Sequence, residues 1–181
     1  MRITILLAGI AICFAGPASS QSDGIVEKFF GSYDGKGTWG TGTPPGAMSV
    51  VIKPHGNGFN ITWDSKPLKD PRGPLGKPRS IDFLTTEKRG LYLPAEHRNR
   101  QDVPTAANPL KGKLPDQPLI WARIEADRLS LYTYTKTSDG DKDLQVYHRT
   151  LTGNRMKLHF LRYLNSVPIK QTKGKLRRVA E

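Results

Sequence analysis

Hydrophobic and polar positions alternate along most of this chain, in short runs separated by turn residues. The clearest example spans residues 119–163, where four apolar and aromatic runs are separated at 125–128, 138–141 and 152–155. β-Branched and aromatic runs between Gly, Asn and Asp turns are typical of consecutive hairpins. This stretch therefore predicts an up-and-down antiparallel meander, about half of a small barrel.

The same alternation predicts further strands and one short helix. Ile25, Val26, Phe29 and Phe30 form one apolar face of a helix within residues 23–30, which would plug one barrel end. Pro168 argues against a regular central strand over 165–170. The strands expected outside the meander cover 30–39, 48–53, 59–64, 80–87, 91–94 and, as a last strand or basic tail, 173–179.

The predicted fold class follows from this count. It is all-β: a single antiparallel up-and-down β-barrel of about 8–10 strands with a short N-terminal helix.

Residues 31–39 read GSYDGKGTW, so glycines and aromatics alternate at the start of the first strand. Repeated glycine on one face suits a strand that curls sharply to close a barrel. A short helix, then G-x-[WY]-x-G-x-G, then a meander resembles the start of calycin-type barrels: lipocalins, fatty-acid-binding proteins and nitrobindin-like haem barrels. The resemblance implies a barrel that binds a small ligand. In nitrobindin-like barrels the haem histidine lies shortly before the final strand, but residues 161–179 contain no histidine.

Residues 1–20 have the pattern of a signal peptide. Arg2 supplies positive charge, residues 3–14 are apolar but too short to span a bilayer, and small residues precede an expected cleavage after Ser20. The only cysteine, Cys13, lies in this leader, so no disulfide is expected in residues 21–181, the predicted barrel domain. We therefore expect a periplasmic or secreted protein, and the lack of cysteine suits a bacterial periplasm.

The chain is strongly basic, with 28 Lys+Arg against 16 Asp+Glu. Such a charge favours anionic partners. For an exported protein, anionic lipid and glycan are favoured over nucleic acid, and we expect a monomer. Two long loops at 65–79 and 95–117 are rich in Pro, Lys and Arg, and they would frame a positive entrance if they lie at the same barrel end.

Histidine offers one chemically suggestive pair. The turn at 152–155 places His148 directly opposite His159 on one face of the predicted hairpin, where the two rings could bind a metal or haem. The alternative is a pair of half-exposed polar residues, because no Asp, Glu or Cys of matching spacing completes a metal site. We found no nucleophile motif, phosphate-binding loop or paired carboxylates, so the chain is not expected to be an enzyme.

Aromatic residues recur in nearly every predicted strand, and the barrel interior is either a packed core or a ligand cavity. The favoured function is binding of a small hydrophobic or amphipathic, anionic ligand. The alternatives are a solid barrel that binds anionic lipid or polysaccharide through its surface, and a haem or metal barrel. The residues expected to contact the ligand are Trp63, Tyr132, Tyr134, Arg72, Arg98, Arg123, Arg149 and Arg162.

Overall fold

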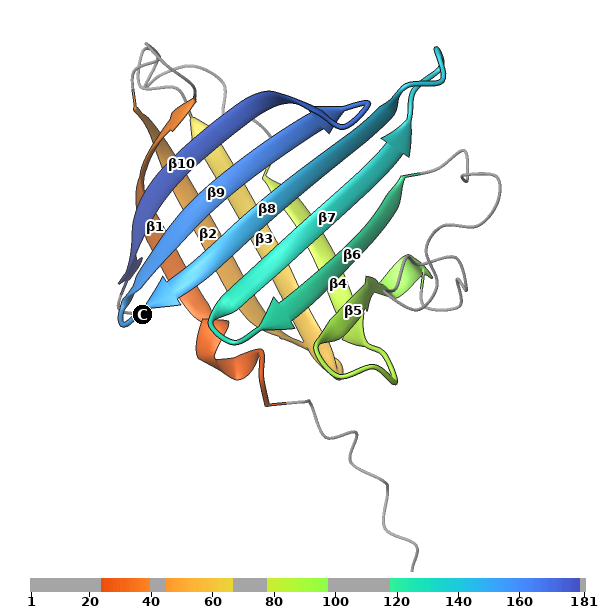
Figure 1. Ribbon diagram of the computed structural model, residues 1–181. Helices are drawn as coiled ribbons and strands as arrows, with labels where there is room; N and C mark the ends of the chain where they lie inside the picture. The colour runs from red at the N-terminus through yellow and green to blue at the C-terminus, as the bar shows by residue number, and fades with distance from the viewer. Residues whose placement is uncertain (1–23, 40–44, 67–77, 98–117, 180–181) are drawn as a thin grey trace, which may run out of the picture.

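The computed structural model describes residues 24–39, 45–66, 78–97 and 118–179, and within them the chain forms one closed antiparallel barrel of ten strands (Figure 1). The all-β barrel prediction is confirmed. The leader and the predicted loop residues Arg72 and Arg98 lie outside the described residues. The strands are β1 (Gly31–Trp39), β2 (Gly46–His55), β3 (Gly58–Lys66), β4 (Arg79–Thr85), β5 (Leu91–Pro94), β6 (Leu119–Glu125), β7 (Arg128–Lys136), β8 (Lys142–Thr152), β9 (Arg155–Leu164) and β10 (Val167–Val179).

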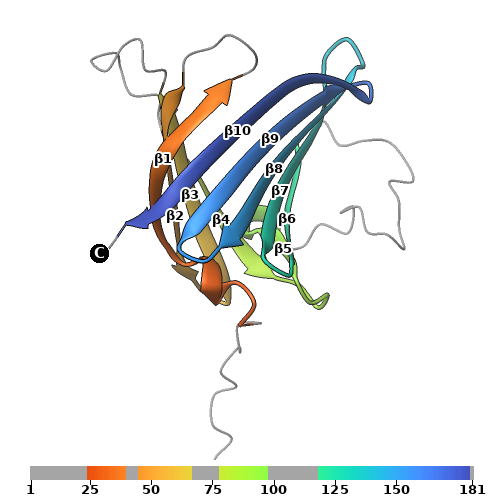
Figure 2. The same cartoon turned by 60° about the vertical axis from the view of Figure 1, so that its left-hand side comes forward.

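Each strand pairs with its neighbours in sequence, and β1 also pairs with β10 to close the barrel (Figure 2). The meander runs from β6 to β9, with its three turns where the polar breaks predicted them. Glycine makes the closure tight. A Cβ added to Gly35 would lie 2.8 Å from the Cα of Leu176 on β10, closer than real Cβ atoms approach backbone. The glycine pattern of the first strand therefore serves the β1–β10 seam.

The helical plug is shorter than predicted. Residues 23–30 yield only η1 (Glu27–Phe29), a 3-10 turn of three residues, followed by Gly31 at φ 132°. A segment this short forms too few backbone hydrogen bonds to nucleate an α-helix. Its apolar residues still enter the core, because Val26 and Phe29 are fully buried at one end of the barrel. A second 3-10 turn, η2 (Ala95–His97), follows β5.

Strand β10 corrects a second expectation. The sequence argued against a regular strand at 165–170, yet β10 begins at Val167 and contains Pro168. The register to β9 shifts between Pro168 and Lys170, so an irregularity in the ladder accommodates the missing N–H of proline. The last strand therefore has 13 residues, longer than the 173–179 segment predicted.

The half of the barrel next to η1 is a packed core. Phe59 and Phe83 stack with ring centroids 5.2 Å apart, and the Tyr92 ring meets Phe59 edge-on at 5.1 Å. All three side chains are fully buried. Tyr33 ties the plug to the wall, because its hydroxyl donates to the Phe29 carbonyl oxygen at 3.0 Å. No helix within the described ranges is long and apolar enough to cross a membrane.

Replacing Phe59 by Ala should destabilise the barrel by about 3–5 kcal/mol, because it empties the centre of this aromatic cluster. Chemical denaturation of the two proteins measures the difference. Val167→Ala is the matched control, since that side chain is 60% exposed and should change stability by less than about 0.5 kcal/mol. Equal effects of the two substitutions would contradict a packed core at this end.

Candidate functional site

The half of the barrel away from η1 is hollow. It contains a cavity of about 550 Å³, a size typical of small-ligand sites. Inward-facing positions of β2, β3, β4, β8, β9 and β10 supply its wall. Apolar and aromatic side chains on this wall are Met48, Val50, Trp63, Tyr147, Leu158 and Phe160, and polar ones include Arg79, Gln145, Arg149, Arg162, Lys170 and Thr172.

Arg149 is the most unusual residue of the cavity. It occupies an inward position of β8, between Leu129 on β7 and Leu158 on β9, and only 2% of the residue is exposed. Its guanidinium lies 5.4 Å from the ring centre of Trp63 and 5.8 Å from that of Tyr147, close enough for cation–π attraction. Within the described part of the chain, its Nε and Nη1 have no hydrogen-bond partner.

Burial lowers the pKa of Arg149 to about 10, with a smaller opposing effect from Tyr147. A pKa of about 10 leaves the guanidinium protonated at neutral pH. The cavity therefore contains a desolvated positive charge that contacts aromatic faces but no carboxylate of the described residues. Lys, Glu, Arg and Asp are almost never buried in this way without a partner.

Arg162 is a contrasting case in the same wall. Its Nε donates to both oxygens of Asp143 at 3.1 and 3.0 Å, and its Nη2 donates to Oδ2 at 2.7 Å. These hydrogen bonds raise the pKa of Arg162 above its ordinary value. Because Asp143 neutralises Arg162, this pair adds no net charge to the cavity.

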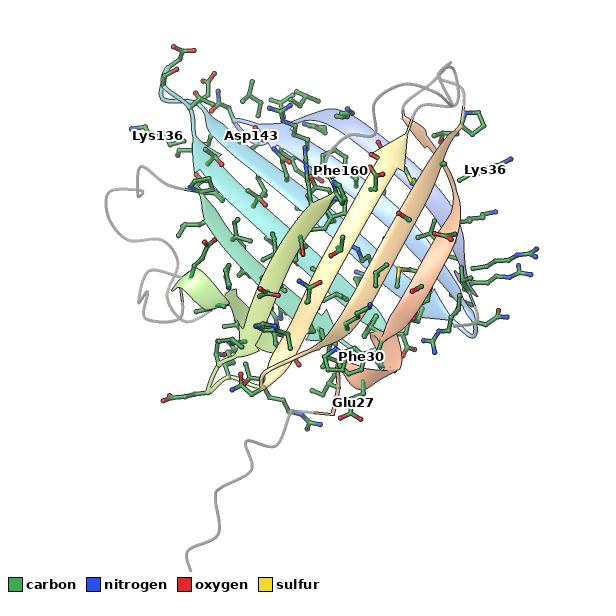
Figure 3. All side chains as sticks on the ribbon, turned by 180° about the vertical axis from the view of Figure 1, so that it is seen from behind. Glu27, Phe30, Lys36, Lys136, Asp143 and Phe160 are labelled. Atoms are coloured by element: carbon green, nitrogen blue, oxygen red, sulfur yellow. The ribbon has the colours of Figure 1, made fainter. Side chains whose placement is uncertain are left out.

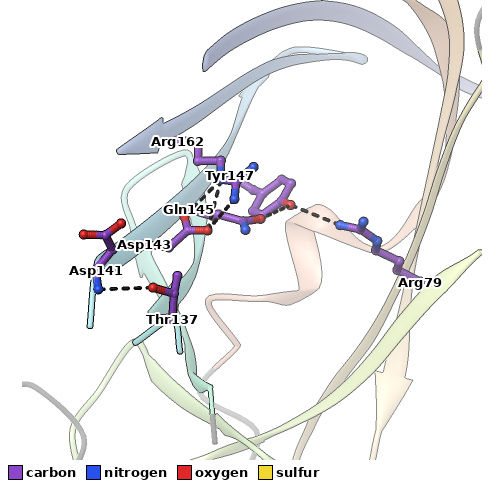
Figure 4. A network of polar contacts seen from close by, with 7 residues as sticks. All are labelled: Arg79, Thr137, Asp141, Asp143, Gln145, Tyr147 and Arg162. Atoms are coloured by element: carbon purple, nitrogen blue, oxygen red, sulfur yellow. Dashed lines mark hydrogen bonds and ion pairs between the residues drawn. The ribbon is translucent and has the colours of Figure 1, made fainter. Parts of the chain in front are cut away.

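A hydrogen-bonded chain crosses the barrel from β4 to β8 (Figure 4). Arg79 on β4 donates to the Tyr147 hydroxyl oxygen at 3.3 Å, and that hydroxyl donates to Gln145 Oε1 at 3.0 Å. Burial raises the pKa of Tyr147, although the nearby Arg79 and Arg149 oppose the shift. Tyr147 is therefore a neutral phenol at neutral pH, suited to hydrogen bonding rather than to proton abstraction.

Thr172 adds a further polar group to the wall. The residue is 4% exposed, and its hydroxyl has no hydrogen-bond partner among the residues that the structure describes. An unpaired buried hydroxyl costs free energy unless a bound molecule or water satisfies it. The cavity thus combines a buried cation, this hydroxyl and apolar side chains.

The structure separates the residues predicted from sequence into two groups. Trp63, Arg149 and Arg162 line the cavity. Tyr132, Tyr134 and Arg123 lie on the outer wall, because Leu129 and Leu131 occupy the inward positions of β7 and the pairings to β6 and β8 carry this alternation across.

On that outer wall, Tyr132 stacks on Trp121 with centroids 4.9 Å apart, and Arg123 forms an ion pair with Glu125 at 2.7 Å. These residues therefore do not contribute to the cavity as described. Sequence reasoning also missed the contributions of Arg79, Tyr147 and Thr172. The alternation of side chains along β8 and β10 could have indicated Tyr147 and Thr172, but only if the pairing of these strands with their neighbours had been known.

The histidine pair has the register that the sequence predicts: His148 lies opposite His159, with ring centroids 6.3 Å apart. Both are among the residues that line the cavity, but the alternation along β8 and β9 places their side chains at outward positions, in register with Ser130 and Lys173. His148 Nδ1 shares a hydrogen bond of 2.8 Å with the Ser130 hydroxyl, and His159 Nε2 lies 2.6 Å from the Gln171 amide nitrogen. Both partners occupy outward positions.

This arrangement does not fit a haem inside the barrel, because neither imidazole points into it. No group of three His, Cys, Asp or Glu side chains suited to a metal ion occurs within the described ranges. The two histidines instead take part in hydrogen bonds on the outer surface, with Ser130 and Gln171.

No protein-family model matches the chain, and no curated protein sequence matches it. Its candidate function therefore depends on the site itself.

The pH dependence of stability should report on His148. Burial lowers its pKa below the ordinary value of 6.5, and Arg128 and His159 lower it further. The unfolded chain then binds the proton more readily, so stability should fall as the pH drops below about 6.5. Urea unfolding at pH 7 and pH 5 should show a smaller loss for His148→Gln than for the original protein. An unchanged loss would show that His148 does not contribute.

Proposed function

We propose that this protein binds one small amphipathic ligand inside the barrel, with the anionic group of the ligand beside Arg149 and its apolar part against the cavity wall. The observation that carries the proposal is the buried guanidinium of Arg149, which has no carboxylate partner among the described residues. A bound carboxylate, sulfonate or phosphate would supply the missing partner.

Charge supports an anionic rather than a neutral ligand. Among the described residues, Asp143 is the only carboxylate in an ion pair with a lining cation, and it is used by Arg162. Arg79, Arg149 and Lys170 remain as positive groups around one cavity, against one further carboxylate in the lining, Asp64. In a low-dielectric space such charges attract an anion more strongly than they would in water.

The remaining wall supports an apolar body for the ligand. Met48, Val50, Leu158 and Phe160 line the same space as Arg149. Polar and apolar side chains contribute comparably to this lining, which suits an amphipathic molecule rather than a wholly hydrophobic one. The hydroxyl of Thr172, which has no partner among the described residues, is a further hydrogen-bond donor for the same head group.

Binding, rather than catalysis, suits the chemistry of these residues. A protonated Tyr147 and a charged Arg149 hold an anion but do not abstract a proton. As part of the same proposal we assign the barrel to the calycin type, on its ten-stranded closure and its G-x-Y-x-G-x-G first strand. We also place its action in the periplasm or outside the cell, on the leader pattern of residues 1–20.

Arg149→Met should separate binding of acids from binding of neutral analogues. A dansyl-labelled fatty acid and its methyl ester are titrated by fluorescence. Loss of the buried cation should weaken binding of the acid by about 2–5 kcal/mol, which is at least a roughly 30-fold change in Kd. Binding of the ester should be nearly unaffected. The same variant should be as stable as the original or more so, because Met replaces an unpaired buried charge at similar volume.

Arg123→Met is the matched control, since it removes the same side chain from the outer wall. It should change neither affinity. Equal binding of acid and ester by the original protein would contradict the anionic assignment, and absence of binding to both would refute the cavity function for this ligand class.

A further inference from the structure

The outer face of β1, β9 and β10 carries rows of like charge. Lys36 on β1 lies opposite Lys175 on β10, and Lys175 lies opposite Lys157 on β9. Three lysines thus stand in one row across three adjacent strands, which are about 4.8 Å apart. Like charges placed directly opposite each other in a sheet are destabilising.

The next row continues this charge. Two residues before Lys175 on β10, Lys173 lies between Thr38 on β1 and His159 on β9. Two residues after Lys175, Arg177 lies opposite Arg155 on β9. We call Lys36, Lys157, Lys173 and Lys175 the lysine face. All four are exposed, and together they border a shallow depression of about 630 Å³. Figure 3 shows Lys36 pointing away from the barrel wall.

Neutralising groups are scarce on this face. None of the four lysines forms an ion pair within the described ranges. In the β1–β10 register, the acidic residue nearest to the lysine face is Asp34, which lies opposite Arg177. A surface anion would therefore relieve repulsion that the fold leaves in place.

Strand β10 adds a second, independent observation. Val167, Ile169 and Val179 are the large hydrophobic residues that are most exposed, at 60%, 50% and 42%. All three lie on β10: Val179 has the outward register of Lys173 and Lys175, whereas Val167 and Ile169 lie at the β9–β10 hairpin end, beside the ladder irregularity at Pro168. Lysines flanked by exposed aliphatic side chains suit the bilayer interface, where ammonium groups meet phosphates and apolar side chains enter the acyl boundary.

We propose that the lysine face, with the exposed aliphatic residues of β10, is a docking surface for an anionic lipid bilayer. A soluble polysaccharide would use the lysines but would gain nothing from Val167 and Ile169. The proposal goes beyond the cavity function and does not depend on it, because none of the four lysines is part of the cavity wall.

Cosedimentation with vesicles tests the proposal, using phosphatidylcholine alone and phosphatidylcholine mixed with phosphatidylglycerol. The protein should bind only the mixed vesicles, and binding should weaken strongly at about 1 M salt, where the screening length is about 3 Å. Replacing all four lysines by Gln should reduce affinity roughly five-fold per lysine, and roughly 100-fold or more in total.

The matched control is Lys53→Gln, Lys88→Gln, Lys136→Gln and Lys142→Gln in one chain. These four exposed lysines lie elsewhere on the barrel, so the net charge changes equally. The control should retain most of the binding. An equal loss of vesicle binding in both variants would show that only the net charge matters, and this would overturn the proposal. Absence of binding to the mixed vesicles would overturn it as well.

A third variant, Val167→Ser with Ile169→Ser, tests the choice of a bilayer. It should bind mixed vesicles several-fold more weakly and should not change binding to immobilised heparin. Unchanged vesicle binding by this variant would assign the face to a soluble polyanion instead. Titration with the dansyl fatty acid should give the same affinity for the four-lysine variant as for the original protein, which keeps this test separate from that of the cavity.

Discussion

Closure of the ten-stranded ladder is the constraint on which the remaining structure depends. Once β1 pairs with both β2 and β10, no strand can slip by one residue without exchanging its inward and outward side chains. The glycines at the β1–β10 seam make that closure sterically feasible, as the close approach of Gly35 to Leu176 shows. The core, the cavity and the outer surface are therefore consequences of one register.

Within that register the barrel interior divides into a packed half and a hollow half. Phe59, Phe83 and Tyr92 fill the end next to η1. Toward the other end, Trp63 on β3 and Arg149 on β8 face each other from walls that lie five strands apart in either direction around the barrel. A stable core at one end can support an unfavourably buried charge at the other, and this asymmetry is the main support for the proposed binding function.

The outer wall is differentiated as well. One part is a hydrogen-bonded aromatic and histidine surface around Tyr132 and His148, and another is the cationic seam of β9, β10 and β1. In the proposed picture, the cavity takes an anionic amphiphile while the seam contacts an anionic bilayer. The two sites share the preference for anions expected of a chain with a formal charge of +12.

Alternation of apolar and polar residues was enough to establish the all-β class, the meander turns and the pairing of His148 with His159, because all of these depend on local spacing. It missed the β10 segment around Pro168, since the tolerance of a ladder irregularity depends on neighbouring strands. It also assigned Tyr132 and Tyr134 to the ligand, because both faces of β7 carry large side chains. Only tertiary closure decided which face is inside, and with it that Arg149 is buried beside Trp63 with no carboxylate partner among the described residues. Such a contact joins residues that no local pattern relates, because it depends on how ten strands meet around a common interior.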